Sequence, residues 1–220
     1  MRRIIDLSQT IRDGLVTYPG LPSPVIADYV GREASRSRYA PGHEFQIGRI
    51  DMVANTGTYL DTPFHRFADG HDLSGLDLQR VVDVSGVVVA GPEDGPIGPE
   101  VFRGRDLTGR AVLILTGWSR HFGTERYGDP SHPGLSAEAA EVLVDTHPAV
   151  VGIDSVNIDR TVDGERPAHT LLLRAGIPIV EHLTNLDRLG SDEPFTFTAA
   201  PPPVVGMGSF PVRAYAVVGG

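Results

Sequence analysis

The sequence predicts a mixed α/β fold, either a barrel-like β-sheet core with helices packed outside it or an α+β arrangement of the same elements. Two observations lead to this prediction. Gly and Pro account for 26 and 18 of the 220 residues, and because both residues interrupt regular structure, the helices and strands must be short. Segments rich in Val and Ile recur along the whole chain, whereas segments with a helical repeat are few.

The predicted strands share a high content of Val and Ile and are bounded by turn residues. They are Ile4–Leu7, Phe45–Ala54, Val81–Ala90, Ala111–Thr116, Ala149–Ile153, Ile177–Val180, Val204–Met207 and Val212–Val218.

Two helices are predicted with clear boundaries. Ser136–Thr146 begins with a residue that can cap a helix N-terminus, and its apolar residues share one face. Pro167–Ala175 is followed by Gly176, which is suited to end a helix. A short helical turn is also expected within Leu76–Val82, just before the strand that follows it.

Composition narrows the classes of function. The length suits a single domain over residues 1–220, and the absence of cysteine excludes disulfides, thiolate metal sites and cysteine nucleophiles. The formal net charge of −9 disfavours a nucleic-acid partner, because phosphate binding needs a basic face. No apolar run approaches the roughly 18 residues of a membrane span or forms a signal peptide. We therefore expect a cytoplasmic protein that acts on a small molecule.

The segment NTGTYLDTPFH, residues 55–65, holds the first candidate site. Gly57 can adopt a positive φ and Pro63 has a fixed φ, so Asp61 and His65 are expected on a constrained loop that leaves a core strand. A carboxylate and an imidazole at this spacing suit metal binding or acid–base catalysis. Spacing alone leaves open that Asp61 caps a turn and that His65 is a surface residue.

The second candidate site lies in residues 166–183, the segment RPAHTLLLRAGIPIVEHL. The predicted helix from His169 and the predicted strand to Glu181 each span roughly 10 Å. If the chain reverses at Gly176, the two side chains meet at one level, as a metal-binding pair of imidazole and carboxylate requires. Separate solvation of the two side chains remains the alternative.

Together the two segments resemble the family of metal-dependent hydrolases that contains kynurenine formamidase, isatin hydrolase and related cyclases. Its signature is H-x-G-T-H-x-D-x-P-x-H, which the sequence matches at Gly57, Thr58, Asp61, Pro63 and His65. Further similar segments run along most of the chain: DLSQTI, TYPG, TGWSRHFG at 116–123, HPGLS at 132–136, GIDSVNID at 152–159 and the spacing of His169 and Glu181.

The resemblance implies a swivelling β/β/α fold, a homodimer or tetramer, and hydrolysis of an amide or lactam bond. It implies that Asp61, His169 and Glu181 are ligands of a divalent metal ion, Zn or Mn in relatives, and that His65 is the acid–base residue. The aromatic residues Tyr18 and Phe64 are candidates for contact with the substrate ring.

The sequence departs from the signature at the two positions of its metal-binding histidines, which are Asn55 and Tyr59 here. An amide oxygen binds Zn weakly, and a neutral phenol rarely binds it at all. The remaining two carboxylates and one imidazole suit Mn or Mg better than Zn, and three ligands leave positions open for catalysis. We therefore expect one ion rather than two, with Asn55 free to contact the substrate.

Two alternatives to a metal-dependent hydrolase of small aryl or cyclic amides stay open. In the first, no metal binds, and the same carboxylates and imidazoles form an acid–base cluster in which Tyr59 is a catalytic proton donor. Such a cluster favours cyclisation, dehydration or isomerisation over hydrolysis. In the second, the protein is a homologue that binds a ligand without turning it over.

Overall fold

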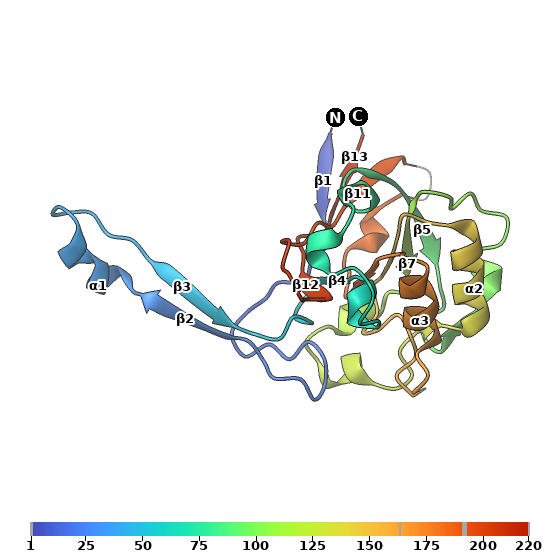
Figure 1. Cartoon of the computed structure of the whole chain (residues 1–220), viewed down its shortest axis with the longest axis horizontal. Coiled ribbons are helices and arrows are strands. Elements are labelled where there is room, and N and C mark those ends of the chain that lie inside the picture. Colours follow the sequence, from blue (N-terminus) through green and yellow to red (C-terminus); the bar gives the residue numbers. More distant parts are fainter. Residues whose placement is uncertain (1, 163, 191–192, 220) are drawn as a thin grey trace.

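The computed structural model describes residues 2–162, 164–190 and 193–219. Within these residues, a curled nine-stranded sheet forms the centre, and a long two-stranded arm projects from it (Figure 1). The strand order in the large sheet is β1-β13-β11-β5-β7-β9-β10-β4-β12. These strands are β1 (Arg3–Asp6), β4 (Tyr59–Asp61), β5 (Val84–Ala90), β7 (Ala111–Leu115), β9 (Val150–Ile153), β10 (Ile179–Glu181), β11 (Phe195–Thr198), β12 (Ser209–Pro211) and β13 (Tyr215–Val218).

Smaller elements surround the large sheet. The described residues also contain two strand pairs, β2 (Val25–Val30) with β3 (Ile47–Asp51) and β6 (Pro96–Ile97) with β8 (Gly134–Leu135). The α-helices there are α1 (Arg32–Ser35), α2 (Ala137–Thr146) and α3 (Pro167–Arg174). Short 3₁₀ helices cover Arg36–Arg38, Pro63–His65, Leu73–Gly75, Leu78–Arg80, Pro99–Val101, Trp118–His121, Glu125–Gly128 and Leu186–Arg188. No helix in the described ranges has the length and apolar character needed to cross a membrane.

Apolar cores lie on both faces of the large sheet. The neighbouring strands β5, β7, β9 and β10 run parallel, and their side chains point alternately to either face. Val112 and Ile114 of β7 belong to the core that also contains Leu172 of α3, whereas Leu113 between them belongs to the core that contains Phe197. Strands buried on both faces are nearly all apolar, which explains the Val- and Ile-rich runs of the sequence.

The mixed sheet with few helices confirms the predicted fold class. The predicted strands that correspond to β1, β5, β7, β9, β10 and β13 are present, with ends shifted by a few residues. Both predicted helices are confirmed as well. The Ser136 side chain accepts a hydrogen bond from the Ala139 N–H at the start of α2, and Gly176 follows α3 with a positive φ of 71°.

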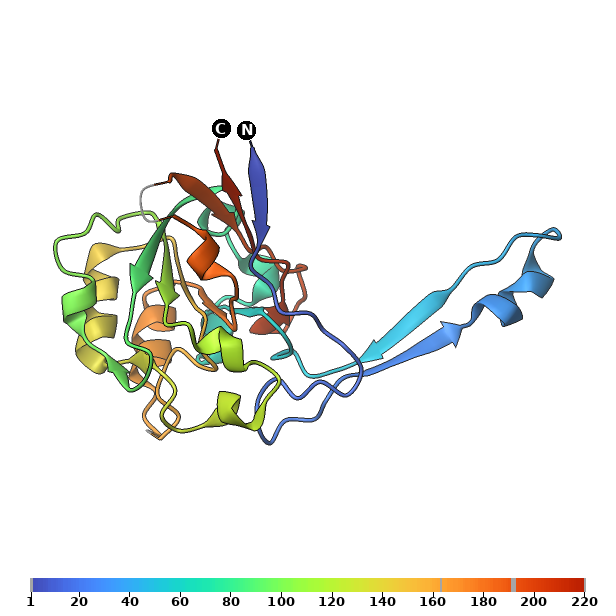
Figure 2. The same ribbon diagram turned by 180° about the vertical axis from the view of Figure 1, so that it is seen from behind.

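The predicted strand Phe45–Ala54 was expected in the core, and that expectation is wrong. Its regular part is β3, which pairs with β2 to form the arm that Figures 1 and 2 show projecting from the body. All five residues of β3 are exposed, including Ile47 at 45% and Ile50 at 54%. Apolar residues along a strand do not reveal what packs on it, because burial depends on distant parts of the chain.

Two further predictions near the site are also wrong. Val204–Met207 is not a strand but an irregular segment with a turn at Gly206, where φ is 77°, and β12 begins just after it. Asp61 lies on strand β4 rather than on a loop. Strand β4 has only three residues, so it carries too little pattern to be recognised from sequence, and β2 and β11 were not predicted either.

Candidate active site

The pairing of β4 with β10 places three polar side chains on one face of the large sheet. Tyr59 and Asp61 are two residues apart on β4, so they point to the same side. Glu181 of β10 lies directly opposite Tyr59 in the antiparallel register and shares that side. All three residues are almost fully buried, between 0% and 3% exposed. The strand register therefore places two carboxylates and a phenol in one small volume.

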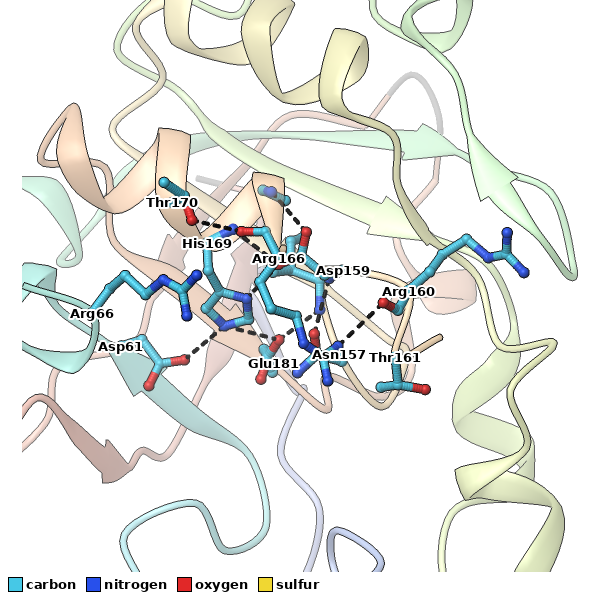
Figure 3. Close-up of polar contacts among 12 residues, drawn as sticks. Asp61, Arg66, Asn157, Asp159, Arg160, Thr161, Arg166, His169, Thr170 and Glu181 are labelled. Carbon is cyan, nitrogen blue, oxygen red and sulfur yellow. Dashed lines mark hydrogen bonds and ion pairs between the residues drawn. The ribbon is translucent and has the colours of Figure 1, made fainter. Parts of the chain in front are cut away.

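Helix α3 adds His169 to this group through a contact with Asp159 (Figure 3). The Asp159 carboxylate accepts hydrogen bonds from the backbone N–H groups of Ala168 and His169 at the start of the helix. It also lies 2.7 Å from His169 Nδ1. Because the Asp159 carboxylate accepts a hydrogen bond from this nitrogen, His169 Nδ1 carries a proton. Nε2 is then the nitrogen of the ring that faces the site.

The His169 Nε2 atom faces two carboxylates. It lies 3.8 Å from Asp61 Oδ2 and 3.6 Å from Glu181 Oε1. Burial alone lowers the pKa of His169, but the carboxylates of Asp159, Asp61 and Glu181 outweigh that effect and raise it to about 10. Burial also raises the pKa of Glu181, to about 7. The surroundings of Nε2 therefore attract a cation.

One carboxylate oxygen of Asp61 accepts a hydrogen bond, and the other has no hydrogen-bond partner among the described residues. Its Oδ1 accepts a short hydrogen bond from Ser209 Oγ, and Ser209 Oγ lies 2.8 Å from His65 Nδ1. Because the serine hydrogen points to Asp61, the His65 Nδ1–H donates to Ser209 Oγ. Asp61 Oδ2 is buried without a hydrogen-bond partner among the described residues. Burial raises the pKa of Asp61, but the positive charges and hydrogen bonds around it lower the pKa overall.

Glu181 is held by two donors. Its Oε2 accepts a 2.5 Å hydrogen bond from the Tyr59 hydroxyl, and its Oε1 accepts one from the Ile158 N–H at 2.6 Å. Burial and the nearby carboxylates raise the pKa of Tyr59 well above its ordinary value, so the phenol is neutral and donates. Glu181 is thereby fixed in position with Oε1 directed to His169.

A cavity of about 310 Å³ opens onto these groups. Two of the predicted site residues, Phe64 and the fully buried Asp61, are not part of the lining. The other six line the cavity: Tyr18, Asn55, Tyr59, His65, His169 and Glu181. A larger cavity of about 630 Å³ between residues 12–19 and 123–128 lacks this cluster of carboxylates and imidazoles. The chemistry therefore points to the smaller cavity.

The donor atoms of the site fit a divalent metal ion. Asp61, His65 and His169 each offer a ligand atom, and these atoms lie within 4.8 Å of one another. Glu181 Oε1 adds a fourth donor next to His169 Nε2. The unpartnered oxygen of Asp61 and the oriented nitrogen of His169 are groups that a metal ion satisfies, and mixed carboxylate and imidazole ligands suit Mn, Zn or Mg.

The family model described as "Putative cyclase" matches residues 5–160. The chain belongs to the cyclase family. Kynurenine formamidase of Bacillus cereus is 30% identical over 216 residues, which cover 96% of this chain and 95% of that protein. Kynurenine formamidase of Geobacillus thermodenitrificans is 30% identical over 214 residues with the same coverage. The expected relationship to this family of enzymes is therefore confirmed.

Solved structures of cyclase-family proteins share the fold. Isatin hydrolase A of Labrenzia aggregata, bound to benzyl benzoate, has a TM-score of 0.82 at 24% identity, with 99% of this chain and 94% of that chain covered. A potential metal-dependent hydrolase with cyclase activity has a TM-score of 0.81 at 23% identity, with both chains fully covered. The curled sheet with its outer helices is thus the architecture of this family.

Sequence reasoning missed several polar residues of this cyclase-family site. Asp159 lies ten residues before His169, at the end of the segment GIDSVNID, but its contact depends on the bend that leads into α3. Nothing in the sequence marked Ser209 as a site residue. It reaches the site because β12 pairs with β4 in the sheet, although the two strands lie far apart in the sequence. Asn157, Arg66 and Arg166 also line the cavity.

Proposed function

We propose that this cyclase-family enzyme hydrolyses a C–N bond of a small aryl or cyclic amide, using one divalent metal ion held by Asp61, His169 and Glu181. The observation that carries the proposal is the meeting of the unpartnered Asp61 Oδ2 with His169 Nε2 and Glu181 Oε1. The relatives named kynurenine formamidase and isatin hydrolase support the reaction and the substrate class.

When bound by these residues, the ion would supply Lewis-acid activation of the water that attacks the amide. The chain's own residues supply proton transfer and orientation. His65 lines the cavity, and its Nδ1–H donates to Ser209, so Nε2 is available to take a proton from the attacking water and return it to the leaving nitrogen. The relay through Ser209 to Asp61 stabilises the positive charge that forms on His65. Asn55 and Tyr18 line the same cavity and are proposed to contact the substrate.

The donor set also guides the choice of metal ion. Two carboxylates and one imidazole form a donor set rich in oxygen, which favours Mn or Mg over Zn. Elemental analysis of protein purified without chelator should find about one such ion per chain.

A metal-independent reaction is the second candidate, and one contact favours it. Tyr59 and Glu181 share a 2.5 Å hydrogen bond beside the cavity, which is an arrangement suited to proton donation and acceptance. This candidate is a cyclisation, dehydration or isomerisation with Tyr59 as the proton donor. It requires turnover that survives EDTA and is lost in both Tyr59→Phe and His65→Ala.

The first test separates the two candidates. Hydrolysis of a panel of aryl formamides and lactams is measured before and after EDTA treatment, and then after addition of Mn, Mg or Zn. We expect EDTA to abolish turnover, metal to restore it, and Asp61→Asn to lower kcat/KM by about a hundredfold to a thousandfold. Turnover that is unchanged by EDTA in protein free of metal would overturn the metal-dependent mechanism.

We also propose that the chain forms a homodimer or tetramer, with the arm in the contact between copies. Support comes from apolar side chains that the arm exposes, among them Tyr29 at 73% and Val25 at 57%. An isolated two-stranded hairpin is only marginally stable in water, so an arm of this kind gains stability when another surface covers it. The expected cytoplasmic location and the single domain stay predictions.

A further inference from the structure

Two arginines line the cavity, and the reaction proposed above does not use them. Arg66 directly follows His65, and Arg166 lies three residues before His169. Figure 3 shows both side chains beside the group formed by His169 and its carboxylates. Each arginine is thus close in sequence to one of the two histidines of the site.

Neither guanidinium group has its charge neutralised within the described part of the chain. Arg66 donates to the backbone carbonyl of Glu165 at 3.0 Å, and Arg166 donates to that of Arg160 at 3.2 Å. Among the described residues, the ion pairs around the site join only histidines to carboxylates. Backbone carbonyls orient a guanidinium group but leave its positive charge in place, with other N–H groups left for a ligand.

The backbone at Arg166 adopts a strained conformation. Its φ of 52° and ψ of 59° lie in the left-handed region, which costs a residue with a side chain about 1–2 kcal/mol. Both the N–H and the hydroxyl of Thr170 donate to the Arg166 carbonyl, at 3.1 and 2.8 Å, and hold this conformation. Strain of this kind is concentrated at binding and catalytic sites.

Asn157 adds a buried amide to the same cavity. It is 9% exposed, and its Oδ1 accepts the Asp159 N–H at 3.0 Å. That bond sets the orientation of the amide, and its two N–H donors have no acceptor among the described residues. Besides the carboxylate of Glu181, the cavity lining therefore carries two positive charges and a neutral donor, although the chain as a whole has a net charge of −9.

We propose that Arg66, Arg166 and Asn157 bind a carboxylate of the substrate that is separate from the amide bond to be cleaved. The proposal rests on the proposed function and narrows its substrate to anionic aryl amides. A planar guanidinium group with several N–H donors matches the two oxygens of a carboxylate. A cavity of about 310 Å³ has room for one substituted ring.

The first test compares substrates that share one amide and differ in one charge. Formanilide is neutral, whereas ortho-, meta- and para-formamidobenzoate carry a carboxylate on the same ring. We expect the enzyme to prefer at least one formamidobenzoate by about tenfold or more in kcat/KM, mainly through a lower KM. Arg66→Gln and Arg166→Gln should bring this ratio close to one, and Arg166→Lys should restore part of it.

Controls separate charge recognition from damage to the fold. Arg49→Gln removes an exposed arginine from the arm and should leave the substrate ratio unchanged. Thermal unfolding of each variant shows whether it is folded. Equal kcat/KM for formanilide and every formamidobenzoate in the unmodified enzyme overturns the proposal, and so does an equal loss for charged and neutral substrates in both Gln variants.

A binding measurement keeps this proposal separate from the proposed function. If no amide is hydrolysed, the proposed function fails, and the anion site is then tested with benzoate and neutral benzamide by calorimetry. Both ligands are titrated into the enzyme as purified and into enzyme treated with EDTA, because a metal ion also binds carboxylates. Tighter binding of benzoate in both forms, weakened by Arg66→Gln or Arg166→Gln but not by Arg49→Gln, supports the site. Equal binding of benzoate and benzamide to EDTA-treated enzyme overturns it.

Discussion

At the residue scale, the site depends on side chains that orient its imidazoles. The Asp159 carboxylate fixes the ring of His169 and also accepts two backbone N–H groups of α3. Ser209 orients the ring of His65 through a hydrogen bond to Nδ1, and it also donates a hydrogen bond to Asp61. These contacts decide which nitrogen of each ring is available for chemistry, so the orienting residues matter to the site as much as the groups they hold.

Asp159→Asn is expected to weaken metal binding. The amide lacks the negative charge that holds His169 Nδ1–H, so Mn affinity measured by calorimetry should fall about 10–100-fold. Because Asp159 also caps α3, urea unfolding of the metal-free protein should show a separate loss of stability of about 1 kcal/mol. Asp106→Asn, at an exposed position, serves as the control. Unchanged Mn affinity in Asp159→Asn would show that the carboxylate does not orient the ligand.

His132 is expected to make stability depend on pH. It is fully buried, accepts the Thr161 N–H on Nε2, and has a pKa lowered from 6.5, mainly by burial. The unfolded chain therefore binds a proton more readily, so the stability that neutral His132 contributes is complete above pH 6.5 and is lost as pH falls through the folded-state pKa. An NMR titration should show the His132 ring still neutral at a pH where an unfolded-chain histidine is charged. Protonation at or above pH 6.5 would contradict this expectation.

At the element scale, close contacts between segments position the turn that carries His65. The turn Pro63–His65 lies against the segment that leads into β12, and a Cβ on Gly208 would come within 2.3 Å of the His65 backbone nitrogen. Thr62 N–H also donates to the Gly208 carbonyl at 2.7 Å. Glycine at this position allows β12 to approach β4 and bring Ser209 to Asp61.

Gly208→Ala should therefore displace the His65 turn. We expect a loss of about 1–3 kcal/mol in the free energy of urea unfolding from overpacking, together with lower kcat. Gly91→Ala is the matched control, because a Cβ there meets only ordinary contacts at 3.5 Å or more. If Gly208→Ala is no less stable than Gly91→Ala, the close approach of β12 to the turn is not a constraint.

At the scale of the whole molecule, a closed body and an exposed arm coexist in one chain (Figure 2). The termini lie side by side because β1 and β13 pair in the large sheet, and the site lies on β4, β10 and α3 of the body. The arm is not held by this core. Ile26 and Ile50 face each other across its strands and are 40% and 54% exposed.

Replacing Ile26 and Ile50 with Ser should weaken association between copies of the chain. The change removes apolar surface from the arm without touching the core, so thermal unfolding of the body should be almost unaffected. Light scattering coupled to size-exclusion chromatography measures the mass. A monomeric unmodified protein, or a variant that associates as strongly as the unmodified protein, would contradict a role for the arm in oligomerisation.

Much of the fold and part of the site were determined by local sequence. Spacing alone left the roles of the pairs Asp61 with His65 and His169 with Glu181 open, and the resemblance to a known family predicted that they share one site. Runs of Val and Ile specified the central strands, and Ser136 and Gly176 marked helix boundaries. These features depend on residues close together in the chain, where backbone preference and side-chain periodicity act directly.

Only the tertiary structure decided the rest. Asp61 meets Ser209 across 148 residues, and Tyr59 meets Glu181 across 122, contacts that exist because distant strands pair in one sheet. The same applies to the arm, because the apolar residues of β3 resemble those of a core strand but are all exposed among the described residues. Local pattern determines which elements form, whereas burial, charge and orientation at the site arise from the packing of segments far apart in the sequence.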